Sequence, residues 1–197
     1  MKKIIVFALS LFLFGTMIFA YDMSVGAGFV FGNVNDTWEN YGTPDNRRDI
    51  SFNRKQYGGF AFFGTKYTEF NCTVRLSRNE WERKWKTGEH AGEVDKMDPD
   101  TLLMLSVGAY GKYPFNLSES VMLFPTIGLD FDAVEGYTYL WFRGGAGLDL
   151  FFTERFFLRG QALYGYGIKP PLINRKEDTT VKPGHGALFK LGVGWMF

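Results

Sequence analysis

The sequence predicts an all-β fold, an eight-stranded antiparallel up-and-down β-barrel with its apolar face turned outward. Three observations predict it. Apolar residues alternate with small or polar ones in eight segments, the connections between segments are alternately long and short, and the 197 residues include 21 Phe, 10 Tyr, 5 Trp and 24 Gly. Successive side chains of a strand point to opposite faces, so alternation indicates strands with two different faces. Aromatic enrichment also favours strands over helices.

The alternation defines eight candidate strands. They cover residues 23–32, 57–63, 70–77, 103–113, 121–131, 140–150, 156–167 and 187–197. A tilted strand needs roughly 9–11 residues to cross a membrane, and the candidate strands are close to this length. The facing of residues 57–63 stays open, because a Gly pair and a Phe pair interrupt the alternation. Pro125 cannot donate to a strand ladder, and it predicts a bulge within residues 121–131.

The connections support the same topology. Long polar connections cover residues 33–53, 78–100 and 169–185, and short ones cover 64–68, 114–120 and 151–155. The connection 132–137 is short and breaks the contrast. Long outer loops that alternate with short periplasmic turns are typical of transmembrane barrels in bacterial outer membranes. An even number of strands then places both ends of the barrel on the periplasmic side.

The first twenty residues have the pattern of an export signal. Lys2 and Lys3 precede an almost wholly apolar run over residues 4–19, and Ala20 is a small residue suited to cleavage. The sequence thus predicts a signal peptide over residues 1–20 and a barrel over residues 21–197. The alternative is an N-terminal membrane anchor, although the run is short for one.

Composition narrows the function classes. The formal net charge is +1, and it becomes −1 without Lys2 and Lys3, so nothing favours a nucleic-acid partner. Cys72 is the only cysteine, which excludes an internal disulfide and a thiolate metal cluster. We expect Cys72 to face lipid as a small apolar residue. After the leader, no apolar run approaches the roughly 18 residues of a transmembrane helix.

The apolar face must meet either lipid or a closed interior. It carries eight large aromatic side chains: Phe29, Phe31, Phe131, Phe142, Phe156, Phe189, Trp195 and Phe197. This volume is too large for the inside of eight strands, whereas the opposite face is rich in glycine and suits a narrow lumen. We therefore predict a transmembrane barrel. The alternative is a soluble periplasmic ligand-binding barrel with the same face inward.

The C-terminal residues resemble a known signal. Lys190, Gly192, Trp195 and Phe197 give a polar residue, a glycine two positions later, and aromatic residues at the third-last and last positions. This pattern resembles the C-terminal assembly signal of bacterial outer-membrane barrels. Residues 23–197 as a whole resemble small barrels of the OmpX, OmpA-domain and OmpW kinds. The resemblance implies a position in the outer membrane, contact with its lipid, and the membrane insertion machinery as a partner during assembly.

Nine polar side chains belong to the face predicted to line the lumen. They are Arg75, Tyr110, Lys112, Asp130, Arg143, Asp149, Arg159, Gln161 and Lys190. Charges in a confined interior must pair, because an isolated buried charge costs several kcal/mol. We expect Arg143 or Arg159 to pair with Asp149 or Asp130, in a network that plugs the barrel. The alternative is a narrow polar path, and five cations against two carboxylates would make it positive.

The second outer loop contains two tryptophans. Ser77 and Glu80 have the spacing of a capping box, and Trp81 and Trp85 follow with the spacing of one helical turn. A short surface helix is expected there. Trp81 and Trp85 are candidates for contact with lipid headgroups or a partner, or they simply pack against the barrel rim.

Catalytic signals are weak. His90 and His185 are the only histidines, and both fall in predicted outer loops without a nucleophile motif or a metal-ligand spacing. We expect no enzyme activity, no metal and no cofactor. The main hypothesis is a monomeric outer-membrane barrel with a structural or surface-interaction role, including a possible extracellular ligand bound by its loops. The alternative is a narrow channel or transporter for small, hydrophobic molecules.

Overall fold

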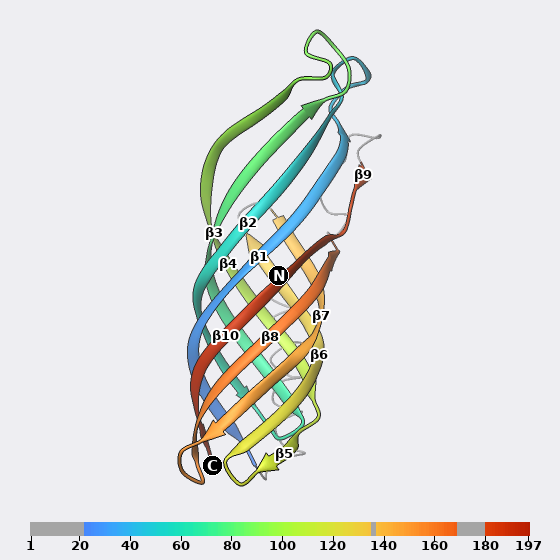
Figure 1. Ribbon diagram of the computed structural model, residues 1–197. Helices are drawn as coiled ribbons and strands as arrows, with labels where there is room; N and C mark the ends of the chain where they lie inside the picture. The colour runs from blue at the N-terminus through green and yellow to red at the C-terminus, as the bar shows by residue number, and fades with distance from the viewer. Residues whose placement is uncertain (1–21, 135–136, 169–179) are drawn as a thin grey trace, which may run out of the picture.

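The chain forms one sheet of antiparallel strands that closes on itself (Figure 1). The computed structural model describes residues 22–134, 137–168 and 180–197. The eight long strands are β1 (Ser24–Tyr41), β2 (Arg48–Gly64), β3 (Thr68–Trp85), β4 (Val94–Lys112), β6 (Val121–Val134), β7 (Tyr137–Phe151), β8 (Phe156–Ile168) and β10 (Gly184–Met196). Two short strands, β5 (Phe115–Ser118) and β9 (Thr180–Val181), and a 3-10 turn (Pro44–Asn46) complete the described elements. Among the described residues, no helix has the length and apolarity needed to cross a membrane.

The ring closes between the first and the last strand. Each long strand pairs with its neighbour in chain order, and β1 pairs with β10 from Ser24 opposite Met196 to Asn35 opposite His185. The start of β1 and the end of β10 therefore lie side by side at the lower end of the barrel in Figure 1. The predicted eight-stranded antiparallel up-and-down barrel is confirmed. The predicted signal peptide lies outside the described residues.

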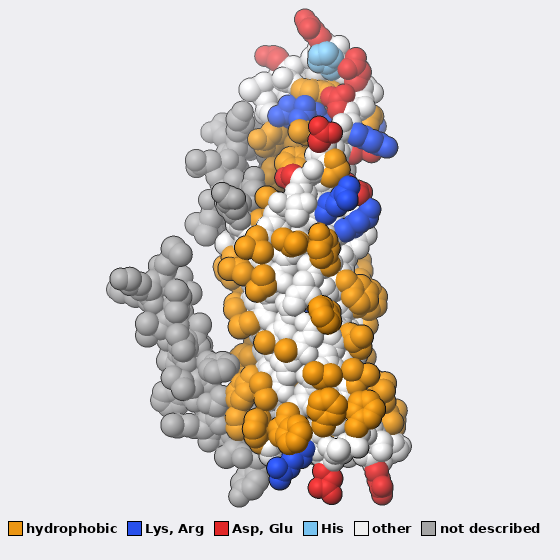
Figure 2. All heavy atoms as spheres, turned by 90° about the vertical axis from the view of Figure 1, so that its left-hand side faces the viewer, with side chains coloured by type: hydrophobic (Ala, Val, Ile, Leu, Met, Phe, Trp, Pro, Cys, Tyr) orange, Lys and Arg blue, Asp and Glu red, His pale blue; other side chains and the backbone are white. Residues whose placement is uncertain are grey.

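The outer surface carries an apolar belt (Figure 2). Its upper limit on β1–β4 is a row of directly paired, exposed residues, Phe31, Tyr57, Leu76 and Leu103. The next outward row is polar and consists of Asn33, Lys55, Arg78 and Thr101. Figure 2 shows charged side chains gathered above the orange belt, and a few below it. The facing left open for residues 57–63 is resolved, since Phe60 and Phe62 are buried inside while Tyr57 is exposed.

The predicted long loops 33–53 and 78–100 are wrong, because strands occupy most of both segments. β1 and β2 join through residues 42–47, and β3 and β4 join through residues 86–93. Figure 1 shows the two hairpins rising above the rest of the barrel. We call their polar upper part, residues 33–41, 48–55, 78–85 and 94–101, the outer sheet.

Three local expectations are also wrong. Residues 77–85 belong to β3 and not to a helix; a spacing of four is even, so it also places residues on one face of a strand. His185 lies in β10, opposite Asn35 and Tyr166, and not in a loop. Pro125 marks no bulge against β7, where the register runs without a shift. Its carbonyl accepts a hydrogen bond from the Tyr113 N–H at 3.1 Å, so the side of Pro125 that lacks a donor faces the end of β4.

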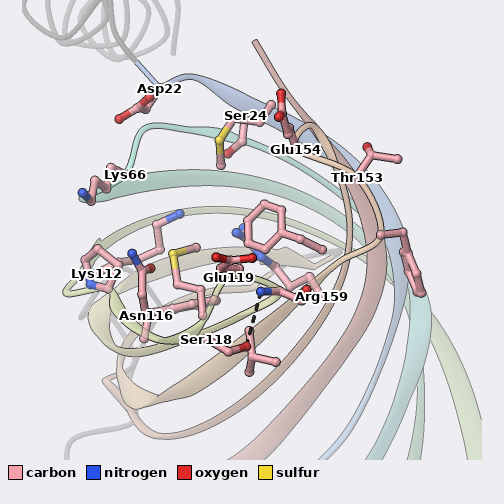
Figure 3. A pocket seen from close by; sticks show the side chains of 18 of the residues that line it. Asp22, Ser24, Lys66, Lys112, Asn116, Ser118, Glu119, Thr153, Glu154 and Arg159 are labelled. Carbon is pink, nitrogen blue, oxygen red and sulfur yellow. Dashed lines mark hydrogen bonds between the residues drawn. The ribbon is translucent and has the colours of Figure 1, made fainter.

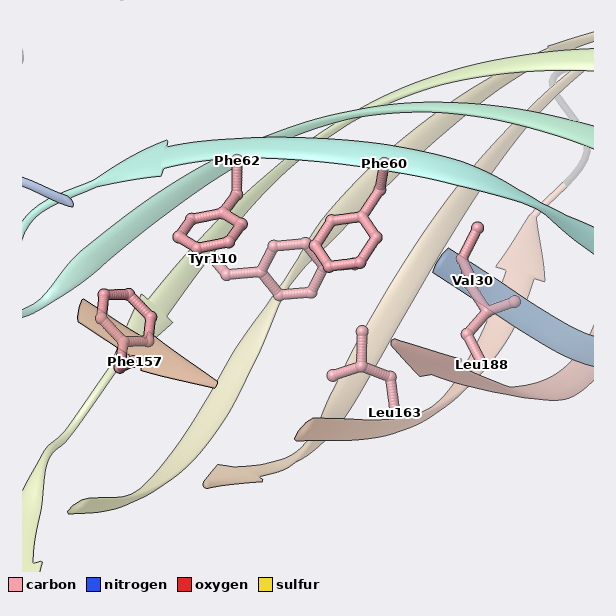
Figure 4. Close-up of a cluster of buried hydrophobic side chains, with 7 residues drawn as sticks. All are labelled: Val30, Phe60, Phe62, Tyr110, Phe157, Leu163 and Leu188. Carbon is pink, nitrogen blue, oxygen red and sulfur yellow. The ribbon is translucent and has the colours of Figure 1, made fainter. Parts of the chain in front are cut away.

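Inside the barrel, large side chains lie over glycines of the neighbouring strand. One apolar cluster contains Val30, Phe60, Phe62, Tyr110, Phe157, Leu163 and Leu188 (Figure 4). Phe157 is paired directly with Gly194, and a Cβ added to Gly194 would lie 2.3 Å from the phenyl ring. Phe124 opposite Gly147 has the same relation. Such ring-over-glycine pairs favour the observed facing, because a glycine leaves the room that each ring occupies and a slip of one residue would turn every side chain to the other face.

Gly194→Ala should therefore destabilise the barrel by about 1–3 kcal/mol, since the buried Phe157 ring would have to shift. The measurement is the free energy of unfolding by urea in lipid vesicles. Gly160→Ala on β8 is the matched control, because nothing lies within 4 Å of its added Cβ. Equal stability of the two variants would contradict the proposed role of the ring.

Candidate functional site

The lower part of the lumen holds a network around Glu69. Arg159 donates from Nε and Nη2 to the two oxygens of Asp149, at 2.7 and 2.5 Å. Its third nitrogen, Nη1, donates to Glu69, which also accepts from the Lys112 Nζ at 3.2 Å. All four side chains are at most 4% exposed. Because β3, β4, β7 and β8 each contribute one charge, the network ties distant parts of the ring together.

A second group lies around Asp130. The Oδ2 of Asp130 accepts from Arg143 Nε at 2.7 Å and from the Tyr110 hydroxyl at 2.6 Å. The Arg143 guanidinium also lies over the Trp141 ring, 4.5 Å from its centroid. Lys190 donates to the Asn71 side chain at 2.8 Å. Arg143 and Lys190 are both almost fully buried. Arg143 is paired with a carboxylate, whereas Lys190 is bonded to a neutral amide.

A third group closes the outer end of the lumen. Arg75 lies 2.6 Å from Asp132, and Arg54 lies 2.6 Å from Asp36. Arg54 also donates to the Tyr139 hydroxyl at 2.7 Å. Asp132 and Arg75 are at most 1% exposed. The Arg54–Tyr139 bond joins β2 to β7, and the Arg75–Asp132 pair joins β3 to β6, so these contacts obstruct the lumen at this level.

The structure corrects the charge expected in the lumen. Five buried carboxylates face six buried cations among the described residues, so the lumen keeps an excess of one positive charge where the sequence predicts three. The residues missed were Asp36, Arg54, Glu69 and Asp132. The signal was present, because Glu69 continues the alternation of Arg75, and Asp132 continues that of Asp130.

All nine side chains predicted to line the lumen lie inside the barrel. Gln161 is buried, and its Nε2 has no hydrogen-bond partner within the described residues. The two Nη atoms of Arg143 likewise have none there. The four residues of the C-terminal pattern are divided between the two faces: Lys190 and Gly192 point inward, whereas Trp195 and Phe197 are exposed on the outside.

Two cavities lie at opposite ends of this interior. The lower one, of about 540 Å³, is bounded by the turns between strands, and Lys112 and Arg159 belong to its lining (Figure 3). The upper one, of about 410 Å³, lies between the outer sheet and the top of the lumen, and we call it the outer cleft. The paired charges described above lie between the two, so the cavities are separated by the plug.

A row of aromatic rings lines the outer cleft. Phe52 lies between Trp38 and Trp81, with ring centroids 5.1 and 5.0 Å apart, and Tyr41 lies 5.8 Å from Trp38. Trp81 donates its indole N–H to Asp100 at 3.2 Å. The candidate loop residue Trp81 is therefore part of the cleft, on the inner face of the outer sheet.

Two arginines stand at the outer end of the same cleft. Arg48 lies over the rings of Tyr41 and Trp85, 5.1 Å from each centroid, and Arg83 lies 5.3 Å from the Trp85 ring. Trp85, the second candidate loop residue, donates to Asp95 at 2.8 Å. Trp85 lies on the same inner face as Trp81 but is not part of the cleft lining. Its ring contacts both arginines from the outer side of the cleft.

The outer face of the outer sheet carries separate surface ion pairs. Lys55 donates to Glu80 at 2.8 Å, and this bond lowers the pKa of the Glu80 carboxyl. Lys182 lies 2.6 Å from Glu39, which raises the pKa of the lysine by hydrogen bonding and charge. Both pairs are solvent-exposed, so they contribute little to stability.

The remaining candidate residues lie apart from both cavities. His90 lies in the β3–β4 connection, with its Nδ1 3.0 Å from Glu93. Cys72 is exposed on the outside of β3. Within the parts of the chain that the structure describes, no three His, Cys, Asp or Glu side chains gather as a metal site would require.

No protein-family model matches the sequence, and no curated protein matches it. Among solved structures, the chain is similar to neisserial surface protein A, with a TM-score of 0.46, 16% identity, and 89% of this chain and 97% of that chain covered. It is also similar to the outer membrane protein OprG from Pseudomonas aeruginosa (TM-score 0.48, 10% identity, 90% and 96% covered). A third is Ail, the attachment invasion locus protein of Yersinia pestis (TM-score 0.38, 13% identity, 89% and 98% covered). The chain thus resembles small outer-membrane β-barrels.

Proposed function

We propose that this chain is an integral outer-membrane protein whose barrel is closed to solutes and whose function is interaction at the cell surface through the outer sheet. The observation that supports it most is the lumen itself. Three groups of paired charges and an apolar cluster lie between the two end cavities. A barrel of eight strands has an interior just wide enough for side chains, so these residues leave no room for a standing pore.

The membrane position is supported by the two faces of the wall. Exposed apolar residues form the belt, and at the level of the belt the charged residues of the same strands are buried. This is the reverse of a soluble barrel. Closure between β1 and β10 also satisfies the backbone groups that lipid could not.

The orientation follows from the ends of the chain. We place the lower end in the periplasm and the outer sheet outside the cell, because the residues of the C-terminal pattern lie at the lower end. Lys190, Gly192, Trp195 and Phe197 would be read by the insertion machinery as the last strand is delivered. The closed ring needs no second copy to complete its hydrogen bonds, so a monomer is expected.

The purified protein should show no unitary conductance steps in planar lipid bilayers, and liposomes that contain it should not take up small solutes. A heat-dependent mobility shift of the same preparation on a gel is the folding control. A wide porin in the same bilayers is the positive control. Stable conductance of the folded protein would overturn closure and favour the transporter, for which the two end cavities would be the entrances.

A further inference from the structure

The outer cleft combines an apolar body with a cationic rim. Along β2, the inner-face residues run in the order Arg48, Ile50, Phe52 and Arg54 from the tip of the hairpin toward the lumen. On the neighbouring strand β3, Trp81 lies directly opposite Phe52, and Met97 of β4 lies opposite Trp81. Leu102 of β4 lines the cleft nearer its inner end, opposite Ser77. Along β2 the cleft is therefore apolar between an outer and an inner arginine, and Asn79 and Asp100 add polar side chains beside the inner one. Its volume of about 410 Å³ falls within the common range for small-molecule sites.

The arginines at the inner and outer ends of the outer cleft differ in whether they are paired with a carboxylate. Arg54, at the inner end, is paired with Asp36 and bonded to Tyr139. Arg48 and Arg83, at the outer end, form no ion pair with a carboxylate of the described residues, although Asp95 is the cross-strand neighbour of Arg83. Arg83 donates from Nη2 to the Met97 sulfur at 3.1 Å. The Nε atoms of Arg48 and Arg83 are buried and have no hydrogen-bond partner among the described residues. The rings of Tyr41 and Trp85 hold the guanidinium groups in place and supply no counter-charge.

Arginine in such a position is suited to an anionic group. A guanidinium presents several donors in one plane and binds carboxylate, sulfate or phosphate oxygens through paired hydrogen bonds. The apolar middle level needs a different partner, because its rings and aliphatic side chains gain most from burying hydrocarbon. Met97 and Met104 also line the cleft, and methionine adapts to apolar groups of irregular shape.

We infer that the outer cleft binds an amphipathic anion, a small molecule with one anionic head and an apolar tail. The head lies between Arg48 and Arg83, and the tail extends past Phe52 and Trp81 toward Met104. The Arg54–Asp36 pair closes the inner end, so the ligand is held and does not pass. The inference rests on the proposed function, in which this end of the barrel faces outward.

The test uses the full barrel in lipid nanodiscs, with empty nanodiscs as the background. Sodium octyl sulfate, below its micelle concentration, is titrated by calorimetry and by tryptophan fluorescence, since Trp38 and Trp81 lie in the cleft. The comparison ligands are 1-octanol, inorganic sulfate and octyltrimethylammonium. Octyl sulfate should bind saturably and about tenfold or more tightly than octanol, as hydrogen bonds to a charged group imply.

The double variant Arg48→Gln, Arg83→Gln should lower the preference for octyl sulfate over octanol to about one. The matched control is Arg78→Gln, Lys84→Gln, which removes the same charge from the outward face of the same outer sheet and should leave the preference unchanged. Leu102→Ser should weaken both ligands to a similar degree, because it changes an apolar part of the lining and no charge.

Three results would overturn the inference. They are no saturable binding of octyl sulfate, equal binding of sulfate alone or of the cationic ligand, and an equal effect of the control variant. Binding of a sulfated oligosaccharide without octyl sulfate would assign the cleft to a polysaccharide and would also overturn it. The proposed function is tested separately. Conductance of a barrel that still binds octyl sulfate would refute only the claim that the barrel is closed. Absence of binding to a non-conducting barrel would refute only the claim that the cleft binds an amphipathic anion.

Discussion

Replacing Arg159 by methionine is expected to lower the free energy of unfolding by about 3–5 kcal/mol, the cost of breaking a buried charge network from one side. Asp149 would lose both of its hydrogen bonds from Arg159, and Glu69 would keep only Lys112 as a charged partner. Both carboxylates are fully buried, so the loss of the guanidinium leaves their charge largely uncompensated. The measurement is urea unfolding in phospholipid vesicles.

The control for this variant is Arg155→Met, in the turn between β7 and β8. Arg155 is exposed, and its loss should change stability by no more than about 0.5 kcal/mol. If Arg159→Met were within about 1 kcal/mol of the unchanged protein, the lumen would have to be hydrated, and the plug would lose its main support.

Val107→Arg tests whether the outer face of the belt meets lipid. It is expected to have the second largest effect on stability. Val107 is 56% exposed in the middle of the belt on β4, between Leu105 and Ala109. An arginine at this depth should cost about 2–4 kcal/mol in lipid. In a soluble barrel, the same exposed position would accept arginine at almost no cost.

Thr101→Arg on the same face of β4 is the comparison. Thr101 lies above the row that limits the belt, so arginine there should cost about 0–1 kcal/mol. Equal effects of the two variants, measured in vesicles, would refute the assigned position of the bilayer.

The strands inside the belt could be predicted because one of their faces meets lipid and the other a polar interior. Phe70, Val74 and Leu76 have the facing that the alternation predicted, and Arg75 lies on the opposite face. Above the belt the outward face becomes polar, and the inner face mixes aromatic residues with arginines, so the same strands lose a clear hydrophobic period. The sequence of the outer sheet therefore predicts loops, and the spacing of Trp81 and Trp85 fits one helical turn as well as one face of a strand.

The candidate site could be predicted only in part. The lumen residues follow from alternation, but their partners depend on which strands face each other across the ring. Asp36 and Arg54 lie in segments whose polar sequence predicts loops, so the sequence does not place them at the top of the lumen. The outer cleft cannot be predicted for the same reason, since it needs Phe52, Trp81 and Trp38 on three neighbouring strands.

The unequal heights of the strands have a consequence for aggregation. β4 pairs with β6 only from Met104 downward, so among the described residues its segment 94–103 has a hydrogen-bonded neighbour on one side alone. Such an open strand edge invites strand addition by another chain. This segment contains Pro99 and four charged residues, Asp95, Lys96, Asp98 and Asp100, which disfavour that pairing. The opposite margin, on β1, is covered instead by β9, where Trp38 pairs with Val181. The chain thus protects one margin with a short strand and the other with charge and proline.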